Sequence, residues 1–467
     1  MKVILQELKK LHCTPSNLSA VCAPLLCALL IAGGCLGGCG NAGTSDEPTS
    51  TAPTSFQDLG QPISLITPTP EPTPEPTPEP TPTPQPEATL MAVGDNLMHM
   101  GIVNTGKQKD GTRNYDFLFE DISDFIQAAD ISVINQETIF GGNELGFSGY
   151  PYFNSPTEVG DAIVNAGFDV VLQATNHTLD QKQAGVEHCI NFWKQYPQIL
   201  MVGLHEPYEE AEDSDPAARI PLLTVNDITF AILNYTYGPN AEIIPAYART
   251  RMEVLCAWNP KNGALDFTTI NPQVLEDIRT AEEIADVVVV FPHWGTEYMT
   301  SPSKHQQNFA RQMAEAGADL IIGAHPHVVQ PVEWITADNG NECLCYYSLG
   351  NYVSTQKDPI SMLENMAWVT FRKTDNGTII DRERTGSIPL VFQYLSGPLR
   401  FEGVYLLEEY TQEKANKHGI RNWGQKNLYV DDLNKWADEI LGDSVKSAYD
   451  LTGLERNTEL TPTGTDS

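Results

Sequence analysis

Gly323-Ala324-His325-Pro326-His327 follows directly on the apolar run Ala-Asp-Leu-Ile-Ile at residues 318–322. The run predicts a buried strand, and the glycine and proline that follow it predict a turn. Two imidazoles two positions apart on such a turn can converge on one point in a cleft. Neutral imidazole is a good ligand for Zn, Mn or Fe, so His325 and His327 are candidate metal ligands.

Four other apolar runs end in the same way. Each is short and rich in β-branched residues, as buried strands are, and each is followed by turn residues. In an open α/β sheet the ligand site lies outside the carboxyl ends of the strands, so we expect the side chains that follow these runs to gather on one edge. The runs are residues 89–93, 130–134, 168–172 and 285–291, and they are followed by Asp95, Glu137, Asn176, His177 and His293.

This set of donors suits divalent cations. It offers carboxylate, amide and imidazole groups and no cysteine. A carboxylate that bridges two cations holds them about 3.5–4 Å apart, where they can acidify a bound water and stabilise an oxyanion. Mixed oxygen and nitrogen ligands favour Mn, Fe or Zn over Ca or Mg, and they do not choose among the three. We therefore expect one or two divalent ions at the strand ends.

At these residues the chain resembles the CapA family of capsule-synthesis proteins, which are linked to poly-γ-glutamate and are similar to the calcineurin-like metallophosphoesterases. The resemblance extends from about residue 89 to about residue 356. As an ordered set, the motifs that carry it are highly specific. They are Gly94-Asp95, Asn135-Gln136-Glu137, Asn176-His177-Thr178-Leu179-Asp180, His293-Trp294-Gly295-Thr296-Glu297-Tyr298, the segment 317–331, and Tyr347-Ser348-Leu349-Gly350-Asn351-Tyr352.

The resemblance implies a four-layer αββα sandwich like that of metallo-dependent phosphatases. An α/β fold is also what the alternation of strands and helices predicts. We expect helices over residues 156–166, 181–194, 271–284 and 302–316, and further strands over 199–204, 228–235, 368–371 and 401–404.

Carried over position by position, the resemblance implies six metal ligands and one catalytic histidine. The histidine is His177, which in phosphoesterases protonates the leaving group or stabilises the transition state. Asp180 lies one helical turn further on and is a candidate for orienting His177. The ligands are Asp95, Glu137, Asn176, His293, His325 and His327.

The chain departs from the phosphoesterase pattern at one position. Typical phosphoesterases begin with Asp-x-His, and here the third residue is Leu97, so that one expected ligand is missing. His99 is a candidate substitute if the loop after the first strand turns it inward. The departure leaves open whether a second ion binds and whether the protein is catalytic.

The amino-terminal residues have the pattern of an exported lipoprotein. Lysines precede an apolar stretch at 21–32 that is too short for a typical transmembrane helix and reads as the core of a signal peptide. Leu36-Gly37-Gly38-Cys39 then matches a bacterial lipobox, which predicts lipidation of Cys39; Ala32-Gly33-Gly34-Cys35 is a poorer candidate. The alternative is an ordinary cleavage region with an incidental cysteine.

The remaining boundaries follow from composition. Residues 1–39 are predicted to be the lipoprotein signal peptide with its lipobox, 40–88 a disordered linker rich in Thr, Pro and Glu, and 441–467 a disordered polar tail. The resemblance implies that 89–440 form a CapA-like domain with a metallophosphoesterase fold. Dense proline at 67–86 forbids helix and sheet and favours polyproline II, which would extend roughly 60 Å. Such a segment would hold the domain away from a membrane surface.

Charge and cysteine content narrow the class of protein. The net charge of −33 argues against a nucleic-acid partner, which needs a basic surface. Four of the nine cysteines lie beyond the leader, and both a disulfide and free buried thiols are compatible with the sequence. They are Cys189, Cys256, Cys343 and Cys345.

Three functional hypotheses follow. The first is an extracytoplasmic, lipid-anchored, metal-dependent hydrolase or transferase that acts on an anionic envelope polymer, poly-γ-glutamate by resemblance, with a membrane synthesis complex as a possible partner. The second is a non-catalytic component that binds or exports the polymer, which the missing histidine at Leu97 favours. The third is an extracytoplasmic metallophosphoesterase. In the first, His177 acts as general acid or electrostatic stabiliser.

Overall fold

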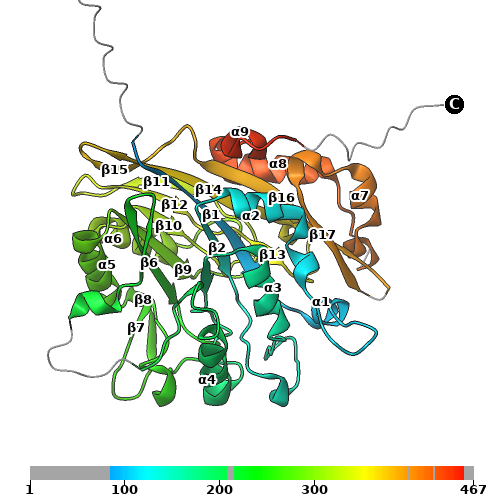
Figure 1. Cartoon of the computed structure of the whole chain (residues 1–467), viewed down its shortest axis with the longest axis horizontal. Coiled ribbons are helices and arrows are strands. Elements are labelled where there is room, and N and C mark those ends of the chain that lie inside the picture. Colours follow the sequence, from blue (N-terminus) through cyan, green and yellow to red (C-terminus); the bar gives the residue numbers. More distant parts are fainter. Residues whose placement is uncertain (1–84, 208–214, 398, 424–425, 457–467) are drawn as a thin grey trace, which may run out of the picture. The chain divides into compact units, whose positions relative to one another are not determined.

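A large mixed sheet forms one half of the protein. The computed structural model describes residues 85–207, 215–397, 399–423 and 426–456 (Figure 1). The nine strands of this sheet run in the order β17-β16-β14-β1-β2-β3-β4, with β13 paired to β1 and β15 to β14. Strands β1 to β4 are parallel, whereas β14, β16 and β17 run antiparallel. The strands are β1 (Glu87–Asn96), β2 (Ile131–Asn135), β3 (Val170–Leu172), β4 (Leu200–Val202), β13 (Asn351–Val353), β14 (Leu363–Thr374), β15 (Gly377–Ile380), β16 (Gly386–Leu395) and β17 (Arg400–Leu406).

A second sheet has six strands in the order β11-β12-β10-β9-β6-β5. Its central strands β6, β9, β10 and β12 are parallel to one another. The strands are β5 (Leu222–Val225), β6 (Ile228–Thr236), β9 (Val287–His293), β10 (Leu320–Ile322), β11 (Val332–Thr336) and β12 (Glu342–Tyr346); β7 (Cys256–Trp258) and β8 (Leu265–Ile270) form a separate hairpin-like pair.

Two of the long helices begin at clear capping signals. Asn271 caps the helix that starts at Pro272, and Ser303 and Gln306 form a capping box before a helix that ends at Gly317 in the left-handed conformation. All four expected helices are present. The helices are α1 (Met100–Thr105), α2 (Ser123–Ala128), α3 (Glu158–Ala166), α4 (Lys182–Trp193), α5 (Pro272–Ile284), α6 (Lys304–Ala316), α7 (Gln412–Lys417), α8 (Val430–Leu441) and α9 (Ala448–Thr452).

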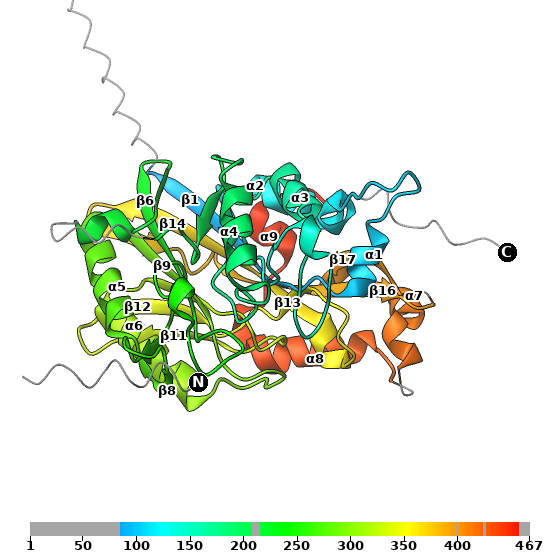
Figure 2. The ribbon, with the colours of Figure 1, turned by 90° about the horizontal axis from the view of Figure 1, so that it is seen from below.

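Alternating side chains build the four layers. In β9, Val287 and Val289 belong to the core between the two sheets, whereas Val288 and Val290 pack with α5 and α6 on the outer face of the six-stranded sheet. The nine-stranded sheet is covered in the same way by α3, α4 and α8. In both views α5 and α6 lie on one side of the sheets and α3 on the other (Figure 2). The expected αββα sandwich is confirmed.

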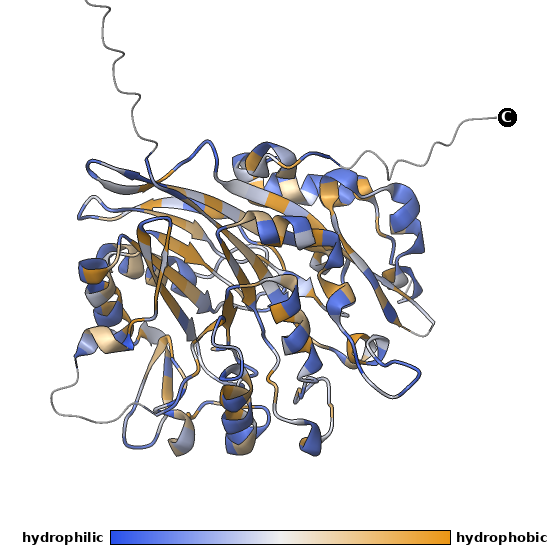
Figure 3. Cartoon of the chain, in the orientation of Figure 1, coloured by the Kyte–Doolittle hydropathy of each residue, from blue (hydrophilic) through white to orange (hydrophobic). Residues whose placement is uncertain are grey.

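Hydropathy follows this arrangement (Figure 3). The strands are largely hydrophobic because their residues alternate between two covered faces. The additional strands expected at 199–204, 228–235, 368–371 and 401–404 are present as β4, β6, β14 and β17. Among the described helices, none combines the length and the apolar character needed to span a bilayer.

The two ends of the chain differ in how much of them the structure describes. Folded structure continues beyond residue 440, where the sequence predicted a disordered tail, because α9 buries Ala448 and Leu451 against the helical layer. The signal peptide, the lipobox with Cys39 and the proline-rich linker fall almost wholly in residues 1–84, outside the described residues.

The cysteines at 189, 256, 343 and 345 are free and buried. Of the two states that the sequence left open, a disulfide and free buried thiols, the structure has the free thiols.

Candidate metal centre

The predicted site residues gather where strands of both sheets end. Asp95 lies at the end of β1, Glu137 just after β2 and His293 at the end of β9. The turn after β10 brings His325 and His327 to the same place, and Ala324 bridges to His293. The seven residues that the sequence placed at strand ends are all buried, none more than 5% exposed. The site therefore spans the junction between the two sheets.

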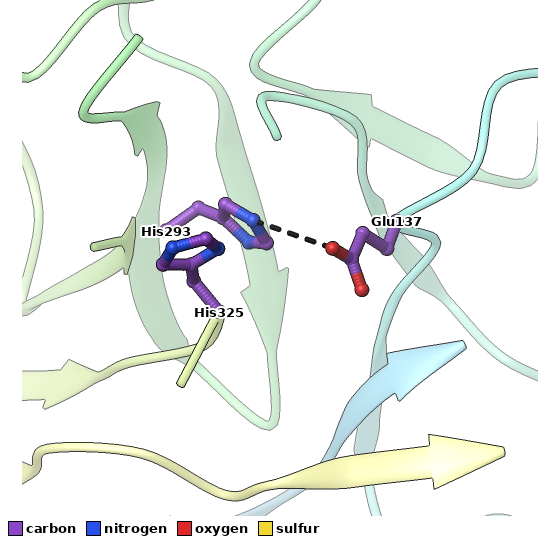
Figure 4. Close-up of side chains that lie close together, drawn as sticks. All are labelled: Glu137, His293 and His325. Carbon is purple, nitrogen blue, oxygen red and sulfur yellow. Dashed lines mark ion pairs between the residues drawn. The ribbon is translucent and has the colours of Figure 1, made fainter. Parts of the chain in front are cut away.

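Short distances join these side chains across the junction. Nδ1 of His327 lies 3.1 Å from Oδ2 of Asp95. Nε2 of His293 lies 2.9 Å from Oδ1 of Asn176. Glu137 is central, because its Oε1 lies 3.8 Å from Nε2 of His293 and 3.7 Å from Nε2 of His327. His293, His325 and Glu137 point toward one another (Figure 4).

Three overlapping groups of donors result, each with its ligand atoms within 4.8 Å of one another. Glu137 is shared by two groups, as a carboxylate that bridges two cations would be. The groups are Glu137 with His293 and His325, Asp95 with Glu137 and His327, and Glu297 with His325 and His327.

Unsatisfied polar atoms in the site test whether a cation fits. Both carboxylate oxygens of Glu137 and Nδ1 of His325 are buried without a hydrogen-bond partner. A buried carboxylate is costly unless it is paired or coordinates a metal, and such orphaned groups are rare in native proteins. The donor chemistry and the unsatisfied atoms therefore fit divalent cations of the Mn, Fe or Zn type.

The pKa shifts divide the donors into two neutral imidazoles and two groups whose protonated forms are favoured. Burial, and then the neighbouring imidazoles, hold the pKa of His293 and His325 well below the usual value, so that both rings are neutral. Burial raises the pKa of Glu137 well above its usual value, an effect that His327 opposes. Burial lowers the pKa of His327, but Glu137 and Asp95 outweigh it and bring that pKa to about 9. A bound cation would displace the protons that the raised pKa values of Glu137 and His327 favour.

The histidine turn has an unusual backbone. His325 has φ of 98° and His327 φ of 57°, in the left-handed region that non-glycine residues rarely adopt. The backbone N–H of His325 donates to Oδ2 of Asp95 at 3.2 Å, which helps to fix the turn. Strained residues of this kind persist where the surrounding structure holds them, and they gather at functional sites.

His177 and Asp180 form a pair beside the donors. Nδ1 of His177 lies 2.7 Å from Oδ2 of Asp180, which also accepts the backbone N–H of Phe153. The Phe153 ring packs edge-on against the imidazole, with 4.7 Å between ring centroids. Nε2 of His177 is thereby turned toward Oε1 of Glu137, 4.0 Å away. Asp180 is therefore in hydrogen-bonding contact with the imidazole that it is expected to orient.

Leu97 and His99 lie where the chain departs from the phosphoesterase pattern. Leu97 is buried, and its backbone N–H donates to the carbonyl of Val353. His99 belongs to none of the three donor groups. Its Nδ1 accepts the N–H of Thr355, and burial lowers its pKa to about 4. His99 therefore does not replace the missing ligand in this structure.

Sequence reasoning missed three polar residues of the site. Nδ2 of Asn135 donates to Oδ1 of Asp95 at 2.6 Å, and Oδ1 of Asn351 lies 3.1 Å from Nδ1 of His327. Such partners orient ligands and tune them. Glu297 is the third, through its donor group with the two histidines of the turn. All three stand inside the motifs quoted above, and that position was the available signal.

Comparison with known proteins identifies relatives for most of this domain. The family described as "Bacterial capsule synthesis protein PGA_cap" matches residues 89–356. The chain is 32% identical to "Capsule biosynthesis protein CapA" of Bacillus anthracis over 49% of this chain and 50% of that protein. It is 27% identical to "PGA biosynthesis protein CapA" of Bacillus subtilis over 61% of this chain and 68% of that protein. The match thus spans about half of the length of the first relative.

Solved structures show weaker likeness. A hypothetical protein from Thermus thermophilus is 11% identical with a TM-score of 0.36, covering 64% of this chain and 99% of that one. Haemophilus influenzae NAD nucleotidase (NadN) is 11% identical with a TM-score of 0.37, covering 76% of this chain and 60% of that one.

Proposed function

Because the chain belongs to the PGA_cap family of bacterial capsule synthesis proteins, we propose that it acts in the synthesis, export or attachment of an anionic capsule polymer through a metal-dependent hydrolase or transferase site. The polymer proposed is poly-γ-glutamate, after the PGA named for the Bacillus subtilis relative. The protein would act outside the cytoplasm, anchored to the membrane through Cys39, where it could meet a membrane synthesis complex.

One observation carries the catalytic part of the proposal. Glu137 is buried among imidazoles, and neither of its carboxylate oxygens has a hydrogen-bond partner. A buried carboxylate without a hydrogen bond is costly unless it is paired or binds a metal, and the imidazoles around Glu137 are metal ligands by type. The residues that would hold cations here are Asp95, Glu137, Asn176, His293, His325 and His327.

Bound divalent cations would supply Lewis-acid chemistry, lowering the pKa of water and polarising the oxygen of the bond that is cleaved. The chain contributes the proton transfers. His177, with Nδ1 held by Asp180, presents Nε2 to the centre and would protonate the leaving group. Burial of the surrounding donors limits access of bulk water.

Leu97 favours a second candidate function. A buried leucine where phosphoesterases carry an imidazole removes one donor, as expected if the site has turned from catalysis to polymer binding. In that case the cleft would bind the polymer without cleaving it. Both candidates predict that the protein binds poly-γ-glutamate. Only the first predicts that it also converts the polymer.

The test uses the full chain with poly-γ-glutamate, with Mn²⁺, Zn²⁺ or Fe²⁺ added or with a chelator. Catalysis predicts a change in the polymer's chain length or end groups that the chelator abolishes and His177→Gln reduces. Binding without any such change under all metal conditions would favour the second candidate. Turnover of an aryl phosphate, with the polymer untouched, would point instead to an extracytoplasmic phosphoesterase.

A further inference from the structure

We infer that Glu297 is an additional metal ligand, which closes the centre from its solvent-facing side and offsets the donor lost at Leu97. The inference rests on the proposed function, since it needs a metal centre in the first place. It assigns a role to a side chain outside the set of ligands that the resemblance implies.

The position of Glu297 is the first reason. Its carboxylate forms a donor group with His325 and His327, within 4.8 Å. Glu297 is exposed, whereas the two histidines are 3% exposed each. The two imidazoles also belong, one each, to the two donor groups that share Glu137. Glu297 therefore lies on the open side of the same centre.

The absence of competing partners is the second reason. Within the described residues, the Glu297 carboxylate makes no hydrogen bond or ion pair. Nδ1 of the buried His325 is likewise unpartnered. An exposed carboxylate alone would not indicate a site, since water satisfies it. Here the carboxylate shares a donor group with His325, a buried residue whose Nδ1 is also without a hydrogen bond.

The loop that carries Glu297 is fixed to the histidine turn. Tyr298 has φ of 63°, and its backbone N–H donates to the carbonyl of Pro326 at 2.8 Å. Nε2 of Gln330 donates to the carbonyl of Met299 at 2.7 Å. These bonds tie the two residues that follow Glu297 to the segment that contains both imidazoles. The carboxylate is thus held near the donors instead of moving with a free loop.

The chemistry of the centre gives the third reason. With Leu97 in place of an imidazole, the group of Asp95, Glu137 and His327 has three donors. It shares His327 with the group of Glu297, whose carboxylate would supply a fourth donor. A further carboxylate adds a donor and a negative charge beside the cations. Oxygen ligands of this kind shift preference toward Mn and away from Zn.

The experiment measures metal binding by the chelator-stripped full chain, by calorimetric titration with MnCl₂ and by metal analysis after dialysis. The test variant is Glu297→Gln, which keeps the shape and removes the charge. The control is Glu315→Gln, the same change at an exposed position of α6. Loss of a residue that only hydrogen-bonds to a metal ligand weakens metal binding roughly 10–100-fold. We expect Glu297→Gln to weaken Mn²⁺ binding by at least this factor, or to bind one ion fewer than wild type. The control should match wild type.

The outcomes separate the inference from the function on which it rests. Unchanged stoichiometry and affinity in Glu297→Gln, with normal binding by wild type, would overturn the inference alone. Lower turnover with unchanged metal binding would also overturn it, since Glu297 would then act on substrate. If wild type binds no Mn²⁺, Zn²⁺ or Fe²⁺, the metal centre itself is wrong and both proposals fall.

Discussion

Nδ1 of His327 lies 3.1 Å from Oδ2 of Asp95, although the two residues come from different sheets. Asp95 is the last residue but one of β1 in the nine-stranded sheet, and His327 lies in the turn after β10 of the six-stranded sheet. The contact locates the centre at the junction of the two parallel-stranded regions, where the strand ends of both meet. Changes to the donors should therefore affect metal binding without disturbing the core between the sheets.

Glu137→Gln should stabilise the metal-free protein and abolish its stabilisation by metal. Both oxygens of the wild-type carboxylate are buried without a hydrogen-bond partner, and Nε2 of His327 is no closer than 3.7 Å. Leaving such a group without a hydrogen bond costs about 1–3 kcal/mol. Glutamine removes the charge but cannot bridge cations. The measurement is the melting temperature with a chelator and with excess Mn²⁺, because a ligand that binds only the native state raises that temperature.

Glu364→Gln is the matched control for that prediction. Glu364 on β14 is also buried with both carboxylate oxygens unpartnered, but it belongs to none of the three donor groups. Its replacement should raise the melting temperature of the metal-free protein and keep the metal-induced increase. Equal loss of that increase in both variants would contradict the assignment of Glu137.

Asp180→Asn should lower turnover and leave the metal content unchanged. The 2.7 Å contact between Asp180 and Nδ1 of His177 fixes the orientation of the imidazole, and loss of such a partner costs roughly 10–100-fold. Asparagine retains an oxygen that can accept the N–H of Phe153, so the loop should keep its shape. Steady-state rates and metal analysis on one preparation check this. A parallel loss of metal would show that Asp180 supports the centre instead of His177.

Asp319→Asn should change how stability depends on pH. Burial raises the pKa of Asp319 to about 7 from an ordinary value of 3.8. Between these values the unfolded chain loses the proton that the folded state keeps, so wild type loses stability as the pH rises from about 4 to 7. Asparagine does not titrate, and it keeps an oxygen for the Val288 N–H. The melting temperature of the variant relative to wild type should therefore rise across this interval.

Asp338→Asn controls for removal of a negative charge, because Asp338 lies exposed just after β11. Melting curves at several pH values, with a chelator present, give the comparison. A difference between Asp319→Asn and wild type that stays constant from pH 4 to 8 would contradict the effect of burial on Asp319.

The sequence predicted much of the site because ligands followed strands. The continuous apolar stretch in runs such as 285–291 marks strands covered on both faces, and every residue of β9 is buried. Parallel strands end at a common edge. That reasoning needed no knowledge of sheet order. It brought Asp95, Glu137 and His293 to one place, where the structure has them.

The residues missed depend on contacts that local patterns do not encode. Asn351 reaches His327 only because β13 adds to β1 in parallel, a pairing between residues far apart in the chain. Glu297 approaches the histidine turn through the hydrogen bond from Tyr298 to Pro326. The folded segment beyond residue 440 was missed because its polar sequence has few apolar residues, and only tertiary packing buries Ala448.

The most direct test of the metal centre is the number of Mn, Fe or Zn ions per chain in the purified full-length protein and two variants. His293→Ala removes a buried donor, whereas His305→Ala removes an exposed histidine at the start of α6. We predict one or two ions per chain in wild type and in His305→Ala, and fewer in His293→Ala. No bound ion in wild type after incubation with excess Mn²⁺, Fe²⁺ and Zn²⁺, or equal content in both variants, would contradict the account.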